Sequence, residues 1–218
     1  MKNTRGLRIA IWVVCFLPLL ITLLLYARLP QSIPMHWGIA GEADAWGPRA
    51  GAFGTAALSV GMLLLFELMP RLDPKRKNYE KFTGAYRVLF LAIACFLLFM
   101  QCITLYSALY PAALNVPRIV AGITGLLLCV SGNFMPKFRH NYFCGIRTPW
   151  TLASEECWRR THRFGGVVWV LCGAGIIVIS LFLSGFALYV ALAGIMLGMV
   201  LLCCAYSYWV YCKTEKPE

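Results

Sequence analysis

Uncharged apolar stretches alternate with short charged segments along the chain. Residues 9–27, 50–66, 88–109 and 119–136 contain no Asp, Glu, Lys or Arg. Each stretch has about the 17–25 residues that a helix needs to cross the hydrocarbon core of a bilayer. A fifth stretch, 165–212, has 48 residues, which as one helix would be more than twice the bilayer thickness. Leu183-Ser184-Gly185-Phe186 offers a turn within it, so the pattern predicts six transmembrane helices.

Composition supports an all-α fold, a polytopic membrane helix bundle. Of the 218 residues, 60% are hydrophobic and 13% are charged, and the mean hydropathy is +0.71. A soluble domain of this length has too little interior to hide so much apolar surface. We divide the chain into an N-terminal two-span region, 1–84, with a loop at 28–49, and a four-span region, 85–218, with a polar segment at 132–166.

The positions of the basic residues predict the orientation. With six spans, Arg28, Arg49 and Arg118 fall on one side of the membrane, and the other 17 of the 20 lysines and arginines fall on the opposite side. Basic residues collect in cytoplasmic loops. We therefore expect both termini and segment 132–166 in the cytoplasm and loop 28–49 outside.

Three other interpretations of these features are weaker. The basic start resembles a signal peptide, but residues 9–27 exceed a usual signal core and residues 25–27 lack a cleavage site of small residues. The net charge of +11 suggests nucleic acid, but the bases flank spans, where they orient the chain and meet lipid headgroups. Seven of the ten cysteines lie within spans and no C-x-x-C motif occurs, which favours small apolar packing residues over a disulfide framework.

Ionisable residues are nearly absent from the predicted spans. Only Glu67 lies inside one, near its cytoplasmic end, with Arg71 four residues away. Carriers coupled to protons or ions usually place acids or histidines at mid-membrane, so that class is disfavoured. No H-E-x-x-H, G-x-S-x-G, phosphate loop or dinucleotide motif occurs. We therefore expect no catalytic residue, metal or cofactor, and a protein that is not an enzyme.

Small residues at helical spacing predict contact faces on two spans. They are Ala50, Gly54, Ala57 and Gly61 on the second span and Ala187, Ala191, Gly194 and Gly198 on the sixth. In lipid such stripes let helix backbones approach closely. Packing within one chain is the favoured interpretation, and a dimer interface is the alternative.

Loop 28–49 combines prolines, glycines, tryptophans and acids. Prolines fix extended backbone and glycines permit turns, while Trp37 and Trp46 suit the membrane interface. His36, Glu42 and Asp44 offer three metal ligands, but three ligands on one flexible loop favour a structured interfacial turn instead.

Segment 132–166 predicts a short helix lying along the inner membrane surface between spans four and five. After Pro149, either Thr151 or Ser154 can cap this helix. Glu155 and Glu156 favour its first turn and pair with arginines four residues on, at 159 and 160. Residues Gly165-Gly166 would end the short helix and start span five.

Residues 141–166, N-Y-F-C-G-I-R-T-P-W-T-L-A-S-E-E-C-W-R-R-T-H-R-F-G-G, closely resemble the signature of the SdpI family of bacterial membrane proteins. Loop residues 33–37 and 41–47 are similar to the uncharacterised domain that often precedes this signature, and residues 71–79 fit the region that joins the two. The resemblance covers most of the chain.

The resemblance implies a multi-pass immunity protein of the bacterial cytoplasmic membrane that protects the cell from a secreted toxic peptide. It also implies signalling, by holding a repressor protein at the membrane. An uncoupled transporter or a membrane enzyme is the alternative. Membrane lipids, a toxic peptide and a cytoplasmic repressor are thus the expected partners, with no direct nucleic acid.

Two sets of residues are the candidates for recognition. For the peptide they are His36, Trp37, Glu42, Asp44 and Trp46. For the cytoplasmic partner they are Asn141, Gly145, Arg147, Thr148, Pro149, Trp150, Glu155, Glu156, Trp158, Arg159, Arg160, His162 and Arg163. The guanidinium of Arg147 suits it either to holding the loop, through carbonyls or through Glu155 or Glu156, or to contacting a ligand, and the first role is favoured.

Overall fold

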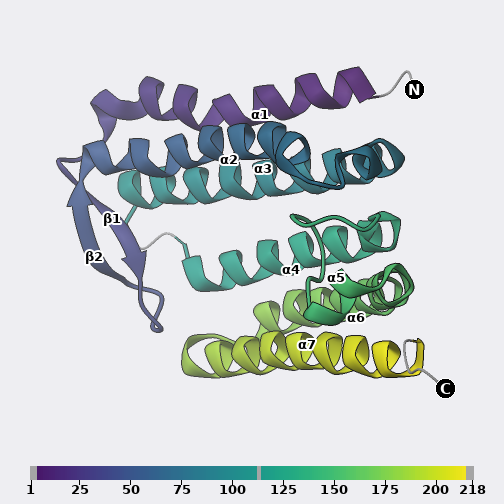
Figure 1. The fold of residues 1–218 in the computed structure, drawn as a ribbon. Coiled ribbons are helices and arrows are strands. Elements are labelled where there is room, and N and C mark those ends of the chain that lie inside the picture. Colours follow the sequence, from purple (N-terminus) through teal and green to yellow (C-terminus); the bar gives the residue numbers. More distant parts are fainter. Residues whose placement is uncertain (1–3, 112–113, 215–218) are drawn as a thin grey trace.

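A computed structural model describes residues 4–111 and 114–214 (Figure 1). The long helices are α1 (Thr4–Leu25), α2 (Ala52–Leu72), α3 (Tyr79–Leu109), α4 (Val116–Phe134), α6 (Glu155–Phe182) and α7 (Gly185–Thr214). All six are long and apolar enough to cross a membrane. The prediction of an all-α membrane bundle with six spans is confirmed. The predicted turn in the last apolar stretch is confirmed as well, since α6 ends at Phe182 and α7 begins at Gly185, whose φ is +57°.

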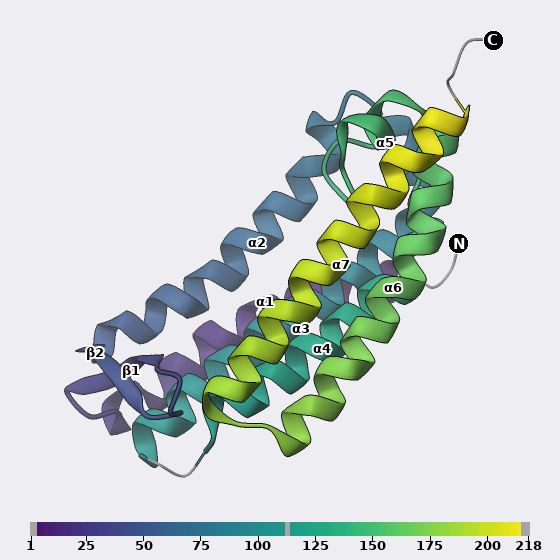
Figure 2. The same cartoon turned by 90° about the horizontal axis from the view of Figure 1, so that it is seen from below.

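The helices form two groups that meet at α3 and α4. Helices α1, α2 and α3 pack on one another, α4 packs on α6, and α7 packs on α6. The start of α1, the end of α7 and the loops α2–α3 and α4–α6 lie at one end, which we call the loop end (Figures 1 and 2). The segment between α1 and α2 lies at the other, the hairpin end. The two loops, the start of α1 and the end of α7 therefore share one side of the bundle, as the six-span topology requires.

A two-stranded antiparallel sheet occupies the hairpin end. Its strands are β1 (Ser32–Trp37) and β2 (Ala43–Pro48), with Ser32 opposite Pro48 and Ile33 opposite Gly47. Ile33 is fully buried against Leu105 and other residues at the ends of the first three helices. The turn between the strands contains Gly41, whose φ of +90° favours glycine. The structured turn expected here is thus a β-hairpin, which the sequence analysis did not predict.

A polar cluster crosses the apolar interior of the first three helices. The side chain of Gln101 on α3 is fully buried. Its amide nitrogen donates to Thr22 Oγ1 on α1 at 2.8 Å and to the carbonyl of Ala52 on α2 at 3.1 Å, and its amide oxygen accepts from the hydroxyl of Thr55. Because no water competes in this interior, these bonds hold α1, α2 and α3 in one register.

Helix α6 runs without a break from the loop end into the membrane. The predicted stop at Gly165-Gly166 is wrong: both glycines lie within α6 and are buried. Gly166 faces α4, where a Cβ would lie 2.7 Å from the carbonyl oxygen of Gly132, and a Cβ on Gly165 would collide with the side chain of Ile146. A short helix does lie between spans four and five, but it is α5 (Pro149–Ala153).

The closest helix contact is made by glycines in α4 and α6. A Cβ on Gly125 would lie 2.6 Å from the oxygen of Gly173, and one on Gly132 would lie 2.6 Å from the oxygen of Gly166. Each helix thus contributes two glycines seven residues apart, and the antiparallel backbones touch at two levels. At this separation the two helices are held by dispersion between their backbones and by weak Cα–H···O bonds, rather than by packed side chains.

The prediction that the small-residue faces pack against other helices of the same chain is wrong. A Cβ on Gly54, Gly61, Gly194 or Gly198 would meet no atom within 4 Å. The buried positions of α2 are instead Ala52, Ala56, Ser59, Leu63 and Phe66. In a membrane, small residues can also face lipid without cost, so their spacing alone does not identify the contact face.

Enlarging one glycine of the α4–α6 contact should destabilise the protein. The new methyl group of Gly173→Ala would lie 2.5 Å from the oxygen of Gly125, so the helices must separate, at a cost of about 1–3 kcal/mol. Thermal unfolding in detergent should show a lower midpoint. The control Gly194→Ala, in open space on α7, should unfold like the unmodified protein; an equal loss in both variants would contradict this assignment.

The charge distribution predicts which end faces outward. Asp44 on β2 and Lys77 in the α2–α3 loop are both exposed and lie at opposite ends. On a background without the ten cysteines, Asp44→Cys should react with a membrane-impermeant maleimide in intact cells. Lys77→Cys should react only after permeabilisation. The reverse pattern would invert the orientation deduced from the basic residues.

Candidate functional site

A cavity of 520 Å³ opens at the hairpin end between the hairpin and the α3–α4 connection. From the hairpin it is lined by Pro34, Trp37, Glu42, Ala43 and Trp46, among others, and from the helices by Ser107, Pro111, Leu114 and Asn115. Trp46 is 55% exposed, so its indole is available to a ligand. Two indoles and one carboxylate at a wet, membrane-adjacent surface suit a ligand that is apolar in part and cationic in part.

The structure divides the five residues predicted to contact a peptide. Trp37, Glu42 and Trp46 line the cavity. His36 and Asp44 do not, and instead join β1 to β2 through a bond of 2.6 Å between Nδ1 and Oδ1. Within the described residues no three His, Cys, Asp or Glu side chains form a metal-binding group. His36 and Asp44 thus hold the strands, and the other three face the cavity.

Two helix residues of this site were missed by the sequence analysis. Asn115 caps α4, and its side-chain oxygen accepts from the amide of Arg118 at 3.3 Å. The hydroxyl of Ser107 is buried and has no hydrogen-bond partner within the described part of the chain. An unpaired buried hydroxyl is unfavourable. No sequence signal identifies either residue, because the hairpin brings them to the site only in the fold.

At the loop end, the buried carboxylate of Asp73 joins the α2–α3 loop to the α4–α6 loop. Asp73 is 2% exposed. Its Oδ2 accepts from the hydroxyl of Tyr79 at 3.0 Å and from the amide of Tyr142 at 2.9 Å, and its Oδ1 accepts from the amide of Lys75 at 2.7 Å. Three donors compensate the burial of the charge. Asp73 and Tyr79 lie in the stretch 71–79 that the family resemblance already included, although they were not named as site residues.

Asn141 organises the turn that follows. It is fully buried, and its side-chain oxygen accepts from the amides of Phe143 and Cys144 at 2.9 and 2.7 Å. Its amide group donates to the carbonyls of Arg139 and Cys144 at 2.8 and 3.0 Å. With a further bond of 3.3 Å from the hydroxyl of Tyr79 to the same oxygen, the side chain makes five bonds. This explains why the position carries Asn, since no other side chain of this size offers two donors and an accepting oxygen.

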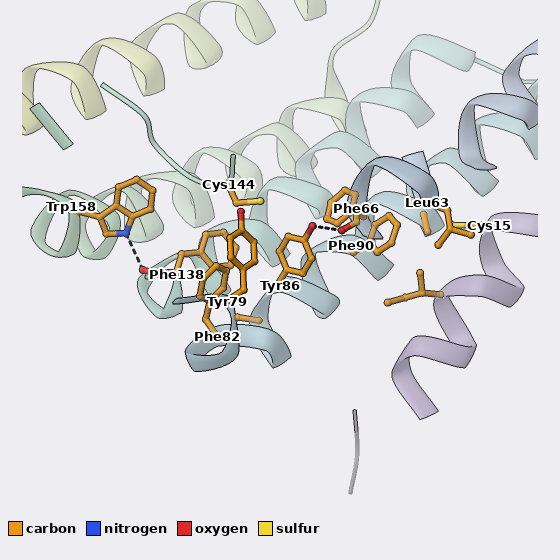
Figure 3. Packing of buried hydrophobic residues seen from close by; sticks show 13 residues of the cluster. Cys15, Leu63, Phe66, Tyr79, Phe82, Tyr86, Phe90, Phe138, Cys144 and Trp158 are labelled. Atoms are coloured by element: carbon orange, nitrogen blue, oxygen red, sulfur yellow. Dashed lines mark hydrogen bonds between the residues drawn. The ribbon is translucent and has the colours of Figure 1, made fainter. Parts of the chain in front are cut away.

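Trp158 and His162 of α6 form hydrogen bonds with the backbone of the α4–α6 loop. The indole of Trp158 donates to the carbonyl of Phe138 at 3.0 Å (Figure 3). Nε2 of His162 accepts from the amide of Ile146 at 3.0 Å, and Nδ1 bonds the carbonyl of Trp158 at 2.8 Å. Gly145 has φ +110°, and a Cβ there would collide with Nε2 of His162. Gly145 is therefore required both by the backbone conformation and by the close imidazole.

The remaining signature residues start the helices or pair on the surface. Thr148 and Thr151 form a capping box at α5, and Ser154 caps α6. Thr148 also donates to Ser207 of α7 at 3.1 Å. Pro149 is the first residue of α5, and the Trp150 ring lies 5.0 Å from that of Tyr208. The predicted cap at Ser154 is confirmed, while Thr151 instead completes the cap of the preceding helix.

The predicted ion pairs of α6 are partly correct. Glu156 binds Arg160 at 2.6 Å as expected, but it also binds Arg159 at 2.7 Å, which was assigned to Glu155. Glu155 lies 4.0 Å from His140. Arg147 donates to the carbonyl of Tyr142 at 3.0 Å, which is the carbonyl alternative of the favoured loop-holding role.

The signature segment thus separates into a buried set and an exposed set. Asn141, Thr148, Trp158 and His162 are buried and build the loop, whereas Tyr142, Arg147, Arg159, Arg160 and Arg163 are exposed. Only the exposed set can touch a partner without unfolding the segment. The sequence pattern could not separate the two sets, because both lie in one continuous motif.

The buried imidazole of His140 predicts that acid loosens the loop end. Its side chain is 4% exposed, and Nδ1 lies 2.7 Å from Lys75 Nζ. Burial, and then the Lys75 ammonium, lower the pKa of His140, while Glu155 opposes them. The unfolded loop therefore binds more protons, and stability is lost as pH falls below the ordinary histidine pKa of about 6.5 toward the lower folded value.

Hydrogen exchange measures this effect. Corrected for intrinsic rates, amides of residues 138–146 should exchange several-fold faster at about pH 5 than at about pH 7.5. His140→Gln should reduce this difference, since glutamine does not titrate in that range, while the buried imidazole of His162 keeps a part of it. An unchanged pH dependence in His140→Gln would show that another group is responsible.

Comparison with known proteins agrees with this arrangement. Residues 137–207 match the SdpI/YfhL protein family and residues 13–60 match a domain of unknown function, DUF1648. The chain is 28% identical over 207 residues to the immunity protein SdpI of Bacillus subtilis (strain 168), covering 94% of this chain and 95% of that protein. No solved structure matches the chain. The SdpI/YfhL match spans α5, α6 and most of α7, the DUF1648 match precedes it, and the relative aligns over nearly the whole length, so the chain is similar to SdpI/YfhL proteins in both of its parts.

Proposed function

We propose that this membrane protein protects a bacterial cell from a secreted toxic peptide by binding it at the hairpin end. The similarity to an immunity protein over nearly the full length of both chains supports the role. The cavity at the hairpin supports this location for the peptide-binding site, because Trp37, Glu42 and Trp46 line it together. That convergence is the observation on which the assignment of the site rests.

The geometry fits a peptide that is amphipathic and cationic. A peptide leaving the membrane surface can bury an apolar side chain against the two indoles, and Glu42 attracts its basic groups. Holding the peptide at the interface removes it from the bilayer, which it must enter to do damage. Such a role requires binding and no catalytic group.

We propose further that the loop end recruits a cytoplasmic repressor protein, with Tyr142, Arg147 and Arg163 as its contacts. Tyr142 is 42% exposed, and both arginines beside it in the signature are exposed as well. Because buried Asp73 and Asn141 hold this surface in one shape, a partner binding to it would lose little conformational freedom. Uncoupled transport is the competing function.

Complementation tests the immunity role. A Bacillus subtilis strain lacking its SdpI protein and expressing this chain should grow in medium conditioned by the toxin-producing parent. Trp46→Ala should lower the tolerated dilution of that medium about tenfold or more, since tryptophan anchors typically dominate a binding interface.

The matched control is Trp209→Ala on α7. Trp209 is 49% exposed, close to the 55% of Trp46, and it lies outside the cavity. Trp209→Ala should protect like the unmodified chain. Equal loss in both variants, or no protection by an unmodified chain that reaches the membrane, would contradict the proposal.

A further inference from the structure

A groove at the loop end lies outside both sites described above. It has a volume of 930 Å³ and runs between α1 and α4, with α3 as its floor. Leu7 and Ala10 of α1 form one wall, Phe134 of α4 and the following turn form the other, and Gly84 and Val88 of α3 lie between them. This volume is within the range of about 300–1,000 Å³ in which proteins hold small ligands.

The groove changes from cationic to apolar along its length. Lys81, Lys137 and Arg139 line it at the loop end. Lys81, Gly84 and Val88 of α3 line it in turn, so the groove proceeds from a lysine into the uncharged span. On α1 the lining residues likewise advance into the apolar span, from Gly6 to Ala10. A ligand that follows this groove needs an anionic head and an apolar tail.

The three cations are free to bind an anion. Among residues 4–111 and 114–214, none of Lys81, Lys137 and Arg139 makes an ion pair with an acid. The ammonium of Lys137 lies 4.6 Å from the centre of the Phe134 ring, which keeps it at the groove wall. Of the two acids at the start of α6, Glu156 is already bound by two arginines and Glu155 lies 4.0 Å from His140.

The floor of the groove is open. Gly84 is exposed although it lies in α3 between two flanking helices, and a Cβ on it would meet no atom within 4 Å. The next residue, Ala85, is buried in the core. Gly84 therefore serves no close helix contact of the kind made by Gly125 or Gly132, and any side chain there would project into the groove.

We propose that this groove is a binding site for one anionic phospholipid. The phosphate group lies among Lys81, Lys137 and Arg139, and an acyl chain follows Gly84 and Val88 into the membrane. The three cations select an anionic headgroup over a zwitterionic one, since each basic residue near the surface favours anionic lipid. Free phosphate would use the same cations but would leave the apolar part of the groove without a ligand.

Lipid retention by the purified full-length protein tests the site. After exchange into detergent micelles containing equal amounts of phosphatidylglycerol and phosphatidylcholine, native mass spectrometry should show one phosphatidylglycerol retained in preference. Replacing all three cations by Gln (Lys81→Gln, Lys137→Gln and Arg139→Gln together) should reduce this preference about tenfold or more. Gly84→Leu should lower retention of both lipids, because its side chain fills the floor.

A matched triple variant controls for charge alone. Arg71→Gln, Arg76→Gln and Lys77→Gln together remove the same charge at the same end, from exposed positions that do not line the groove. This variant should retain phosphatidylglycerol like the unmodified protein, and all variants should keep its unfolding midpoint to within a few degrees. Equal loss in the two triple variants would overturn the specific site. Displacement of the lipid by excess inorganic phosphate would assign the cations to free phosphate instead.

Discussion

The backbone contact between α4 and α6 sets the geometry of the loop end. Gly125 meets Gly173 and Gly132 meets Gly166, so backbone contacts fix the register of the two helices at two points. This register places Trp158 beneath Phe138 and His162 beneath Ile146. The connecting segment between the helices must then fold back over the first turns of α6, where its polar groups find those two side chains.

The same segment is fixed from the other group of helices by Asp73. Its carboxylate accepts hydrogen bonds from the hydroxyl of Tyr79 on α3 and from the backbone amide of Tyr142. The Tyr79 ring packs against Phe82, and the Phe82 ring in turn lies beside that of Phe138 (Figure 3). The buried carboxylate can move little, because the loss of any of its three hydrogen bonds would leave its desolvation uncompensated. The two helix groups are therefore joined rigidly at the loop end, whereas the hairpin presents exposed side chains around an open cavity.

Sequence analysis located the spans because hydropathy depends only on composition along the chain. It failed for the contact faces, since whether Gly54 or Gly125 touches another helix depends on a partner that local spacing does not identify. The hairpin was missed for a related reason: residues 32–37 contain Pro34 and only partial alternation, and Ile33 is buried by helix ends distant in sequence. The signature motif located the loop end correctly. The motif does not distinguish buried His162 from exposed Arg163. It runs from an irregular loop into a helix, so burial along it does not follow one helical periodicity.

The buried amide of Gln101 bears on how the protein enters the membrane during synthesis. Its bonds go to Thr22 and to the backbone of Ala52, two segments that leave the ribosome before it. An isolated α3 would carry this amide into hydrocarbon without partners, at a cost of several kcal/mol by the general estimate for such groups. Entry of α1, α2 and α3 into lipid as one paired unit avoids this cost. Assembly of α4, α6 and α7 then begins on a surface that is already complete.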